Sequence, residues 1–500
     1  MRDIIRPQLR LGEQQISAIE LDPKSRDDIP QILRGLQHIY TTPAIRERVF
    51  AILEEVLPQS VVESESAKAD PNNGRPGMAQ WTILVLGVLR LGLNADYDRI
   101  QELANQHKTI RQMLGHSDWA DETRYALQTL RDNLRLFTPE LLDRINQEVV
   151  SAGHQALKKS PQDALNARCD SFVVETDVHF PTDINLLLDA IRKVIDTAVG
   201  LADQNDLPGW RQSAYHQRQF KKQYRKVQRL KHSTSRDEKK RELKAQEILD
   251  AHRVYLDMAG GHLARAELTR VQSPANCLVT VILLQELEGF TAHARRQIDQ
   301  IDRRVIQGEC IPHEEKCFSI FEPHTEWISK GKAGIPVELG LRVCVVEDSD
   351  RFIVHHQVME RTTDDKVAVC MVDETQQRFP TLGAVSMDKG FHSPANQTAL
   401  KERLEQVVLP KKGRLSKADK ARESDPEFGR LRRQHSAVES AINALECHGL
   451  DTCPDHGIDG FKRYVALAVV ARNVQRLGAV LRQQEREAEE RKRGAYKKAA

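Results

Sequence analysis

Two acidic residues follow short segments whose composition predicts buried strands. Asp388 comes directly after the apolar run LGAVSM and directly before Lys389 and a glycine. A short apolar run bounded by a turn predicts a strand, so this acid lies at the strand's carboxyl end, where open α/β sheets place their ligands. Asp170 ends a second strand-like segment, ALNARCD. An acid before glycine can also be a turn residue that accepts backbone hydrogen bonds, so neither residue defines a site alone.

A third acid, Glu439, lies in a segment that predicts an amphipathic helix, RRQHSAVESAINALE. One stripe of this helix is apolar and consists of Val438, Ile442 and Leu445. The adjacent stripe is polar and includes His435 and Glu439. A helix that lies on the sheet in this way could direct Glu439 toward the end of the strand that precedes Asp388.

Carboxylates from two strand ends and one helix could hold two Mg²⁺ ions, because Mg²⁺ prefers hard oxygen ligands; Mn²⁺ could substitute. Two such ions activate a water or a 3′-hydroxyl and neutralise the leaving oxygen, which is the chemistry of phosphodiester bonds. In a chain with 72 Asp and Glu residues, acids at element ends also arise by chance. The identity of the first acid is open as well, since Asp177 and Asp183 follow Asp170 closely in the sequence.

The other sequence motifs give weaker evidence for a functional site. Cysteine and histidine gather at 310–317 and 447–456, but neither cluster has the paired spacing of a zinc site. The string that begins at His313 lacks the second histidine of a metalloprotease helix, and the H-x-E at His324 lacks the P-C-x-x-C of nucleobase deaminases. No phosphate-binding GxxxxGK[ST] or GxGxxG loop occurs, so a nucleotide cofactor is not expected.

The composition is that of an ordinary soluble globular protein: 500 residues, 40% hydrophobic, 29% charged and a formal net charge of +2. The apolar runs are too short for a membrane span, and the N-terminal segment lacks the apolar core of a signal peptide. Eight cysteines in so long a chain fit a reducing compartment. We expect a cytoplasmic protein that does not enter a membrane.

The predicted elements change along the chain. Helical patterns dominate residues 1–160, with a polar break near 63–77. After Gly331, period-two segments predict an antiparallel hairpin around Asp348–Asp350, followed by a helix over 364–378, the strand that precedes Asp388, and further helices. Mixed strands followed by alternating helix and strand predict an α/β sheet with an antiparallel start.

A basic stretch, Arg211–Lys244, separates the two groups of strands. It interleaves aromatic residues with cations, among them Lys221, Lys222, Arg225 and Lys226. Such a stretch is typical of an arm that contacts phosphates, with an affinity that falls steeply with salt. A solvated helical face has the same pattern, and the sequence by itself leaves both interpretations open.

Segments covering about half of the chain resemble insertion-sequence transposases of the DDE type, in particular the ISNCY group. These segments are NGRPGMAQWTILVLGVLRLGLNADYDRIQELANQHKTIRQMLG, CDSFVVETDVHFPTD, FSIFEPHTEWISKGKAGIPVELGLRV, SMDKGFHS and HSAVESAINALECHGLD. The last two are the most specific, because the second acid of the family lies in a D-K-G or D-R-G turn and the third in H-S-x-V-E. The resemblance implies Asp170, Asp388 and Glu439 as the catalytic, metal-binding acids.

The same resemblance implies an RNase H-like mixed sheet within residues 161–478, interrupted by a basic helical insertion at about 181–312. Residues 1–160 would be a DNA-binding or dimerisation region and 479–500 a charged tail. Lys389, His435 and the basic arm would contact phosphates. The expected partner is double-stranded DNA, both the terminal inverted repeats of the element and the target DNA. At least one further copy of the chain is expected to bind with it. The expected location is the prokaryotic cytoplasm, in association with the nucleoid.

The chain departs from the family pattern at several positions. Related transposases place Tyr, Arg and Lys around the final acid where this chain has Arg432, His435 and Glu446. His435 could take the role of the missing arginine only if protonated or as a neutral donor. Two alternatives remain: a nuclease of the same fold that cuts without joining, and a DNA-binding protein that has lost its chemistry.

Overall fold

The computed structural model of the chain describes residues 3–5, 12–55, 77–117, 121–160, 162–329 and 336–499, with side chains up to residue 492. The predicted polar break near 63–77 lies, apart from Gly77, outside these residues. The chain divides into two compact units. The sheet unit consists of Met1–Asp177 and Ile328–Ala500, and the bundle unit of Val178–Trp327.

Within the described residues, seven strands form one mixed sheet. In chain order they are β1 (Leu165–Thr176), β2 (Glu326–Ser329), β3 (Val337–Asp348), β4 (Ile353–Met359), β5 (Leu382–Met387), β6 (Gln406–Val408) and β7 (Thr452–Cys453). Their order is β2-β3-β1-β5-β6, and β4 also pairs with β3 and β7 with β1. β1 and β4 run antiparallel to β3, whereas β5 and β6 continue in parallel from β1. The predicted α/β class is therefore confirmed, as is the hairpin around Asp348–Asp350.

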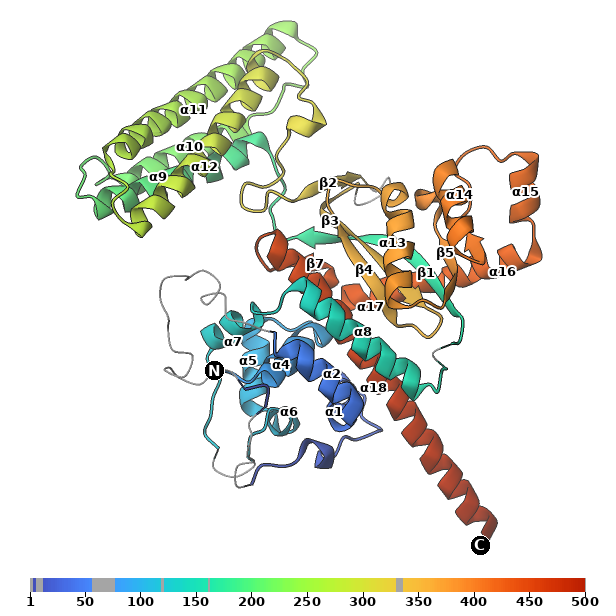
Figure 1. Cartoon of the computed structure of the whole chain (residues 1–500). Helices are drawn as coiled ribbons and strands as arrows, with labels where there is room; N and C mark the ends of the chain where they lie inside the picture. The colour runs from blue at the N-terminus through green and yellow to red at the C-terminus, as the bar shows by residue number, and fades with distance from the viewer. Residues whose placement is uncertain are drawn as a thin grey trace. The chain divides into compact units, whose positions relative to one another are not determined.

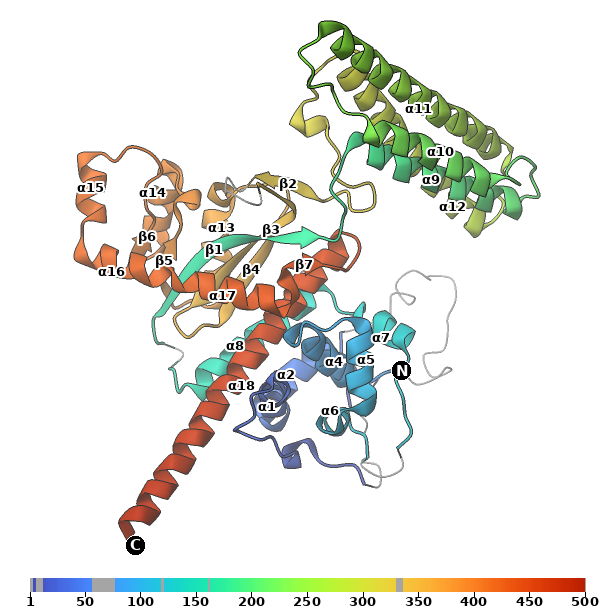
Figure 2. The same ribbon diagram turned by 180° about the vertical axis from the view of Figure 1, so that it is seen from behind.

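Helices cover both faces of this sheet (Figures 1 and 2). α13 (Asp364–Arg378) packs on β3, β4 and β5, and α14 (Pro394–Arg403) packs beside it. On the other face, α16 (Pro426–His435) contacts β5 and β6, and α17 (Ala437–Leu445) contacts β1. α15 (Lys417–Glu423) packs on α16.

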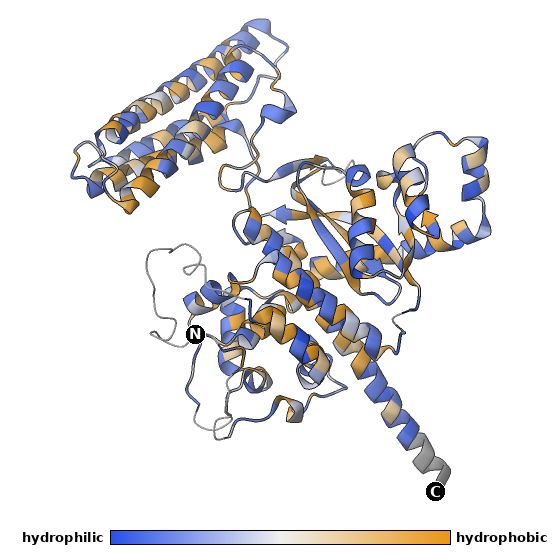
Figure 3. Cartoon of the chain, viewed as in Figure 1, coloured by the Kyte–Doolittle hydropathy of each residue, from blue (hydrophilic) through white to orange (hydrophobic). Residues whose placement is uncertain are grey.

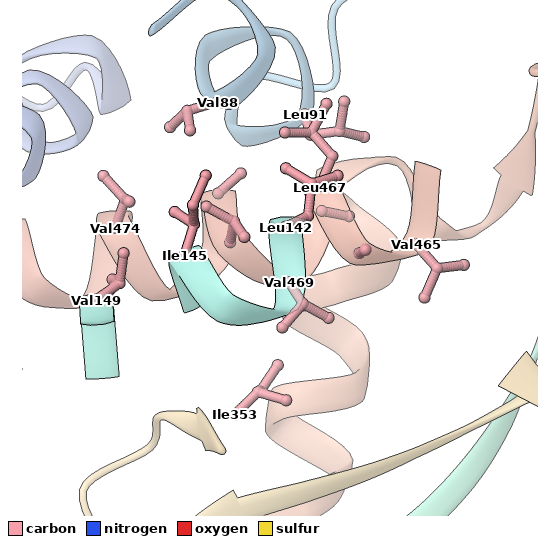
Figure 4. Close-up of a cluster of buried hydrophobic side chains, with 14 of the residues drawn as sticks. Val88, Leu91, Leu142, Ile145, Val149, Ile353, Val465, Leu467, Val469 and Val474 are labelled. Atoms are coloured by element: carbon pink, nitrogen blue, oxygen red, sulfur yellow. The ribbon is translucent and has the colours of Figure 1, made fainter. Parts of the chain in front are cut away.

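The N-terminal helices share one hydrophobic core with the sheet. They are α1 (Asp28–Thr41), α2 (Pro43–Leu53), α4 (Gln80–Gly92), α5 (Tyr97–Gln106), α6 (Lys108–Met113), α7 (Leu127–Leu134) and α8 (Pro139–Ala156). The last helix, α18 (Ile458–Ala499), runs past α1, α4, α8 and β4. Figure 4 shows side chains from α4, α8, α18 and β4 interlocking in this core. The described helices before residue 160 thus pack on the sheet and do not form a separate core.

α18 is long and apolar enough to pass for a membrane span, but 78% of its most apolar stretch is buried inside the protein. Its apolar residues face the other helices of the core, so burial within the fold accounts for its hydropathy. The backbones of α18 and α1 also approach closely. A Cβ atom at Gly478 would lie 1.8 Å from the carbonyl oxygen of Gln31, so only glycine fits there.

The bundle unit has its own hydrophobic core between four long helices. They are α9 (Asp183–Gln204), α10 (Ser213–Arg229), α11 (Glu238–Gln272) and α12 (Leu278–Ile301). Figure 3 shows the hydrophobic stripes of these helices alternating with hydrophilic ones. Tyr255 and Phe220 are fully buried in this core and stack with ring centroids 4.6 Å apart.

Candidate active site of acidic residues

The pairing of β1 with β5 brings Asp170 beside Asp388. These strands are parallel, and Cys169 lies opposite Met387 at the end of the paired segment. The next residues are Asp170 and Asp388, and because side chains alternate in step on parallel neighbours about 4.8 Å apart, both carboxylates project from the same face. Asp388 is exposed where β5 ends, and Asp170 is half-buried.

β1 does not end at Asp170, contrary to the prediction; it continues to Thr176. The following residues, FVVET, are apolar and β-branched enough to extend the pairing with β3, where Phe172 lies opposite Val343. Asp170 therefore lies within a strand rather than at its tip. Asp177 follows the end of β1, seven residues and about 23 Å further along an extended chain. Asp183 is in the bundle unit, where its carboxylate pairs with Arg304 at 3.0 Å.

Glu439 reaches the same place from α17. Ser436 separates α16 from α17, and the apolar stripe of α17 is buried against the sheet through Val438, Ala441 and Leu445. This burial turns Glu439 outward over β1, where its side chain is exposed. The helix predicted from the pattern of Val438, Ile442 and Leu445 therefore presents Glu439 as expected from an amphipathic helix.

The charges of the other acids act on Asp170. Its pKa is raised to about 6, chiefly by burial and also by the negative charges of Asp388, Asp364 and Glu439, although a backbone hydrogen bond from Ser171 lowers it. That bond, from Ser171 N to Asp170 Oδ1, measures 2.8 Å. Several carboxylates that repel one another around a half-buried acid form a site that a cation would stabilise.

His435 is a partly buried imidazole on which the charges of Asp388 and Glu439 act. Its Nδ1 lies 3.1 Å from the hydroxyl of Ser386 on β5, and burial lowers its pKa while the charge of Asp388 opposes that change. If the Ser386 hydroxyl donates to Nδ1, the ring proton is on Nε2. Nε2 is buried and has no hydrogen-bond partner among the described residues. Burial therefore favours the uncharged ring, and Nε2 is enclosed by protein atoms.

The other predicted phosphate contact near the acids, Lys389, is exposed in the turn that follows β5. Arg432, one of the departures from the family pattern, lies 3.7 Å from the carboxylate of Glu423. Asp364 was missed by sequence reasoning. It opens α13 and resembles any acid at a helix start, so no local signal connects it with Asp170.

A separate cluster of His154, Asp348 and Asp350 could hold a metal ion, because one ligand atom from each lies within 4.8 Å of the others. It is the only such group within the part of the chain described. Its atoms already have protein partners. His154 Nε2 lies 2.6 Å from Asp348 Oδ2, and Asp348 Oδ1 accepts from two backbone amides of the β3–β4 turn. Asp350 also pairs with Lys159.

The basic stretch forms a groove in the bundle unit. The cavity measures about 670 Å³ and is lined by Gln219, Lys222, Gln223, Arg225, Lys226, Arg229, Leu230 and Met258. None of its four cations has an ion pair among the residues described, and all four are exposed. Lys221, also predicted to bind DNA, lies on the same helix outside the groove. The interleaved aromatic residues differ from one another: Phe220 is buried and Tyr224 is partly buried in the bundle core, whereas Tyr215 is exposed.

No protein-family model, curated protein or solved structure matches this chain. By its fold, the chain is a mixed α/β protein with an inserted helical bundle.

Proposed function

We propose that this chain is a metal-dependent DNA transposase with an RNase H-like core. The observation that carries the proposal is the convergence of Asp170, Asp388 and Glu439, which come from β1, the end of β5 and α17 and all contribute to one electrostatic cluster. These are the acids that the resemblance to DDE transposases implies. An antiparallel start followed by parallel strands, with the long β1 in the centre, also supports an RNase H-like core.

The donors fit divalent cations. All three are carboxylates, the hard oxygen ligands that Mg²⁺ and Mn²⁺ prefer. The ions of a two-metal site lie about 3.5–4 Å apart, and carboxylates from three different elements could hold such a pair. When bound, the two ions would activate a water or a 3′-hydroxyl and stabilise the leaving oxygen.

The remaining residues supply binding and orientation. His435 lies close enough to Asp388 for that charge to act on its imidazole, and Lys389 adds a positive charge in the adjacent turn. The groove on α10 would hold a DNA backbone through Lys222, Arg225 and Lys226. Terminal-repeat recognition, assembly of at least two copies on DNA and a cytoplasmic, nucleoid-associated location belong to this proposal.

The test is Mg²⁺-dependent nicking of a duplex that carries the inverted repeats flanking the gene, with a binding assay on the same DNA. Asp388→Asn and Glu439→Gln keep the side-chain shape but remove a charged oxygen. We expect each to reduce nicking by at least about 100-fold, with DNA binding retained. Glu446→Gln, two turns further along from Glu439, is the control and should nick normally.

If Asp388→Asn and Glu439→Gln nick as well as the parent chain, the metal site is assigned wrongly. A strand-transfer assay on the same DNA separates the two enzymatic candidates. A transposase joins the nicked 3′-end to a second duplex, whereas a nuclease releases it. Parent protein that binds DNA but never nicks it would favour the DNA-binding protein without chemistry.

A further inference from the structure

Asp364 is a fourth carboxylate beside the three acids, and it comes from the opposite face of the sheet. It is the first residue of α13, and its charge acts on Asp170 together with those of Asp388 and Glu439. Its Oδ1 accepts a hydrogen bond of 2.7 Å from the hydroxyl of Ser171. Because side chains alternate along a strand, Ser171 faces α13 while Asp170 faces α17.

Ser171 connects the two carboxylates directly. Its hydroxyl donates to Asp364, and its backbone amide donates to Asp170 Oδ1 at 2.8 Å. The bond to Asp364 fixes the side chain of Ser171, and the amide bond fixes the carboxylate of Asp170. Asp364 is therefore connected to Asp170 through one intervening residue, as outer hydrogen-bond partners are connected to metal ligands.

The turn after Asp388 also approaches Asp364. A Cβ atom at Gly390 would lie 2.9 Å from Asp364 Oδ2, so a larger residue there would displace the carboxylate. Asn396 of α14 holds this turn against α13, since its Nδ2 donates to the carbonyl oxygens of Phe391 at 2.8 Å and Asp365 at 2.6 Å. Contacts from β1, the turn and α14 thus gather around the start of α13.

The ordinary role of an acid at a helix start is to stabilise the helix by interacting with its dipole. Asp365 is also in the first turn of α13, and it accepts a hydrogen bond of 2.5 Å from the hydroxyl of Thr363. Helix stabilisation therefore applies to both residues. Of these two residues, only Asp364 accepts a hydrogen bond from Ser171, and only its charge acts on Asp170. A comparison of Asp364 with Asp365 therefore distinguishes an effect on the acidic site from stabilisation of the helix.

We propose that Asp364 is a positioning residue of the metal site, which orients Asp170 through Ser171 and adds negative charge that favours divalent cations. This inference rests on the proposed metal-dependent function. It predicts that loss of Asp364 weakens metal binding even when no DNA is present. Outer partners of metal ligands typically change metal affinity by about 10–100-fold when removed.

The experiment is calorimetric titration of the full chain with Mn²⁺, with circular dichroism as a check of folding. Asp364→Ala removes both charge and hydrogen bond, and we expect Mn²⁺ affinity to fall by about 10–100-fold. Asp364→Asn keeps an acceptor for Ser171 and Ser171→Ala keeps the charge, so each should show a smaller loss. Asp365→Asn is the matched control and should bind Mn²⁺ like the parent chain.

Three results would overturn the inference: parent-like Mn²⁺ affinity in folded Asp364→Ala, an equal loss in Asp365→Asn, or no Mn²⁺ binding by the parent chain. Failure of the transposase proposal looks different. In that case Asp364→Ala still weakens Mn²⁺ binding while the parent chain neither nicks nor joins DNA. Conversely, parent-like affinity in Asp364→Ala with complete loss in Asp388→Asn would retain the metal site and remove Asp364 from it.

Discussion

Individual histidines in this protein are kept neutral by burial. At the acidic site, burial lowers the pKa of His435 and so favours the neutral ring, which adds no charge that would repel cations. In the bundle, the pKa of His262 is lowered from 6.5 to about 4, chiefly by burial and also by the nearby His216 and Arg265. The edge of the His262 ring packs against Phe220, so the imidazole takes the place of an apolar side chain.

The lowered pKa of His262 makes the bundle sensitive to acid. Above pH 6.5 the imidazole is neutral in both the folded and the unfolded chain, and stability is unaffected. As the pH falls from 6.5 toward about 4, only the unfolded chain takes up the proton, so stability is lost by at most about 1.4 kcal/mol per pH unit. Hydrogen exchange of α10 and α11, corrected for the intrinsic pH effect, should show this loss. His262→Phe should reduce it, whereas substitution of exposed His232 by Phe should not.

At the scale of elements, α10 has one apolar face and one basic face. Phe220 and Val227 anchor it in the bundle core, and its outer face carries cations without a single acidic residue. Lys222, Arg225, Lys226 and Arg229 recur at helical spacing, so they form one stripe along the groove. Cations without ion pairs along a groove are suited to a polyanion, because each phosphate contact releases counterions.

The stripe on α10 predicts a change in salt dependence. Substituting Lys222, Arg225 and Lys226 with Gln should weaken binding to all DNA sequences alike and lower the salt slope by about one unit per lost contact. Fluorescence anisotropy at several salt concentrations measures both effects. Lys221, a further predicted contact, lies on the same helix outside the groove, so Lys221→Gln shows whether phosphate contacts extend beyond the groove. An unaltered slope in the triple variant would make the stripe a solvated face.

At the scale of the molecule, buried polar bonds tie the helical layer of the sheet unit to the sheet. Asn473 on α18 is fully buried and donates to Asn146 on α8 at 2.7 Å and to the carbonyl oxygen of Ile353 on β4 at 2.8 Å. Its Oδ1 accepts from the amide of Ile353 at 2.9 Å. One side chain thus completes the hydrogen bonds of β4 and positions two helices.

Asn473→Leu should destabilise the sheet unit, because the Ile353 amide and the Asn146 side chain lose a buried partner. Each unsatisfied group costs about 1–3 kcal/mol, and the larger apolar volume of leucine does not replace those bonds. Urea unfolding monitored by circular dichroism measures the loss. Gln483→Leu alters an exposed polar residue of the same helix and should change stability by no more than about 0.5 kcal/mol.

The sequence by itself determined the elements whose signals are local. Ser393 and Pro394 begin α14 as predicted, and the Ser393 side chain accepts from the amide of Asn396 at 3.1 Å. The apolar run before Asp388 is β5, and the amphipathic pattern around Glu439 is α17. Strand ends, helix caps and amphipathic stripes depend on residues that are close together in the sequence, so they can be predicted from the sequence.

Only the tertiary structure decided which of these elements meet. Asp170 lies beside Asp388 because β1 pairs in parallel with β5, with Cys169 opposite Met387, across more than 200 residues of sequence. Asp364 joins them because α13 packs on the face toward which Ser171 points. Side-chain packing over the whole core determines which distant strands pair and in which register. The periodicity of hydrophobic residues within one segment does not specify its partner.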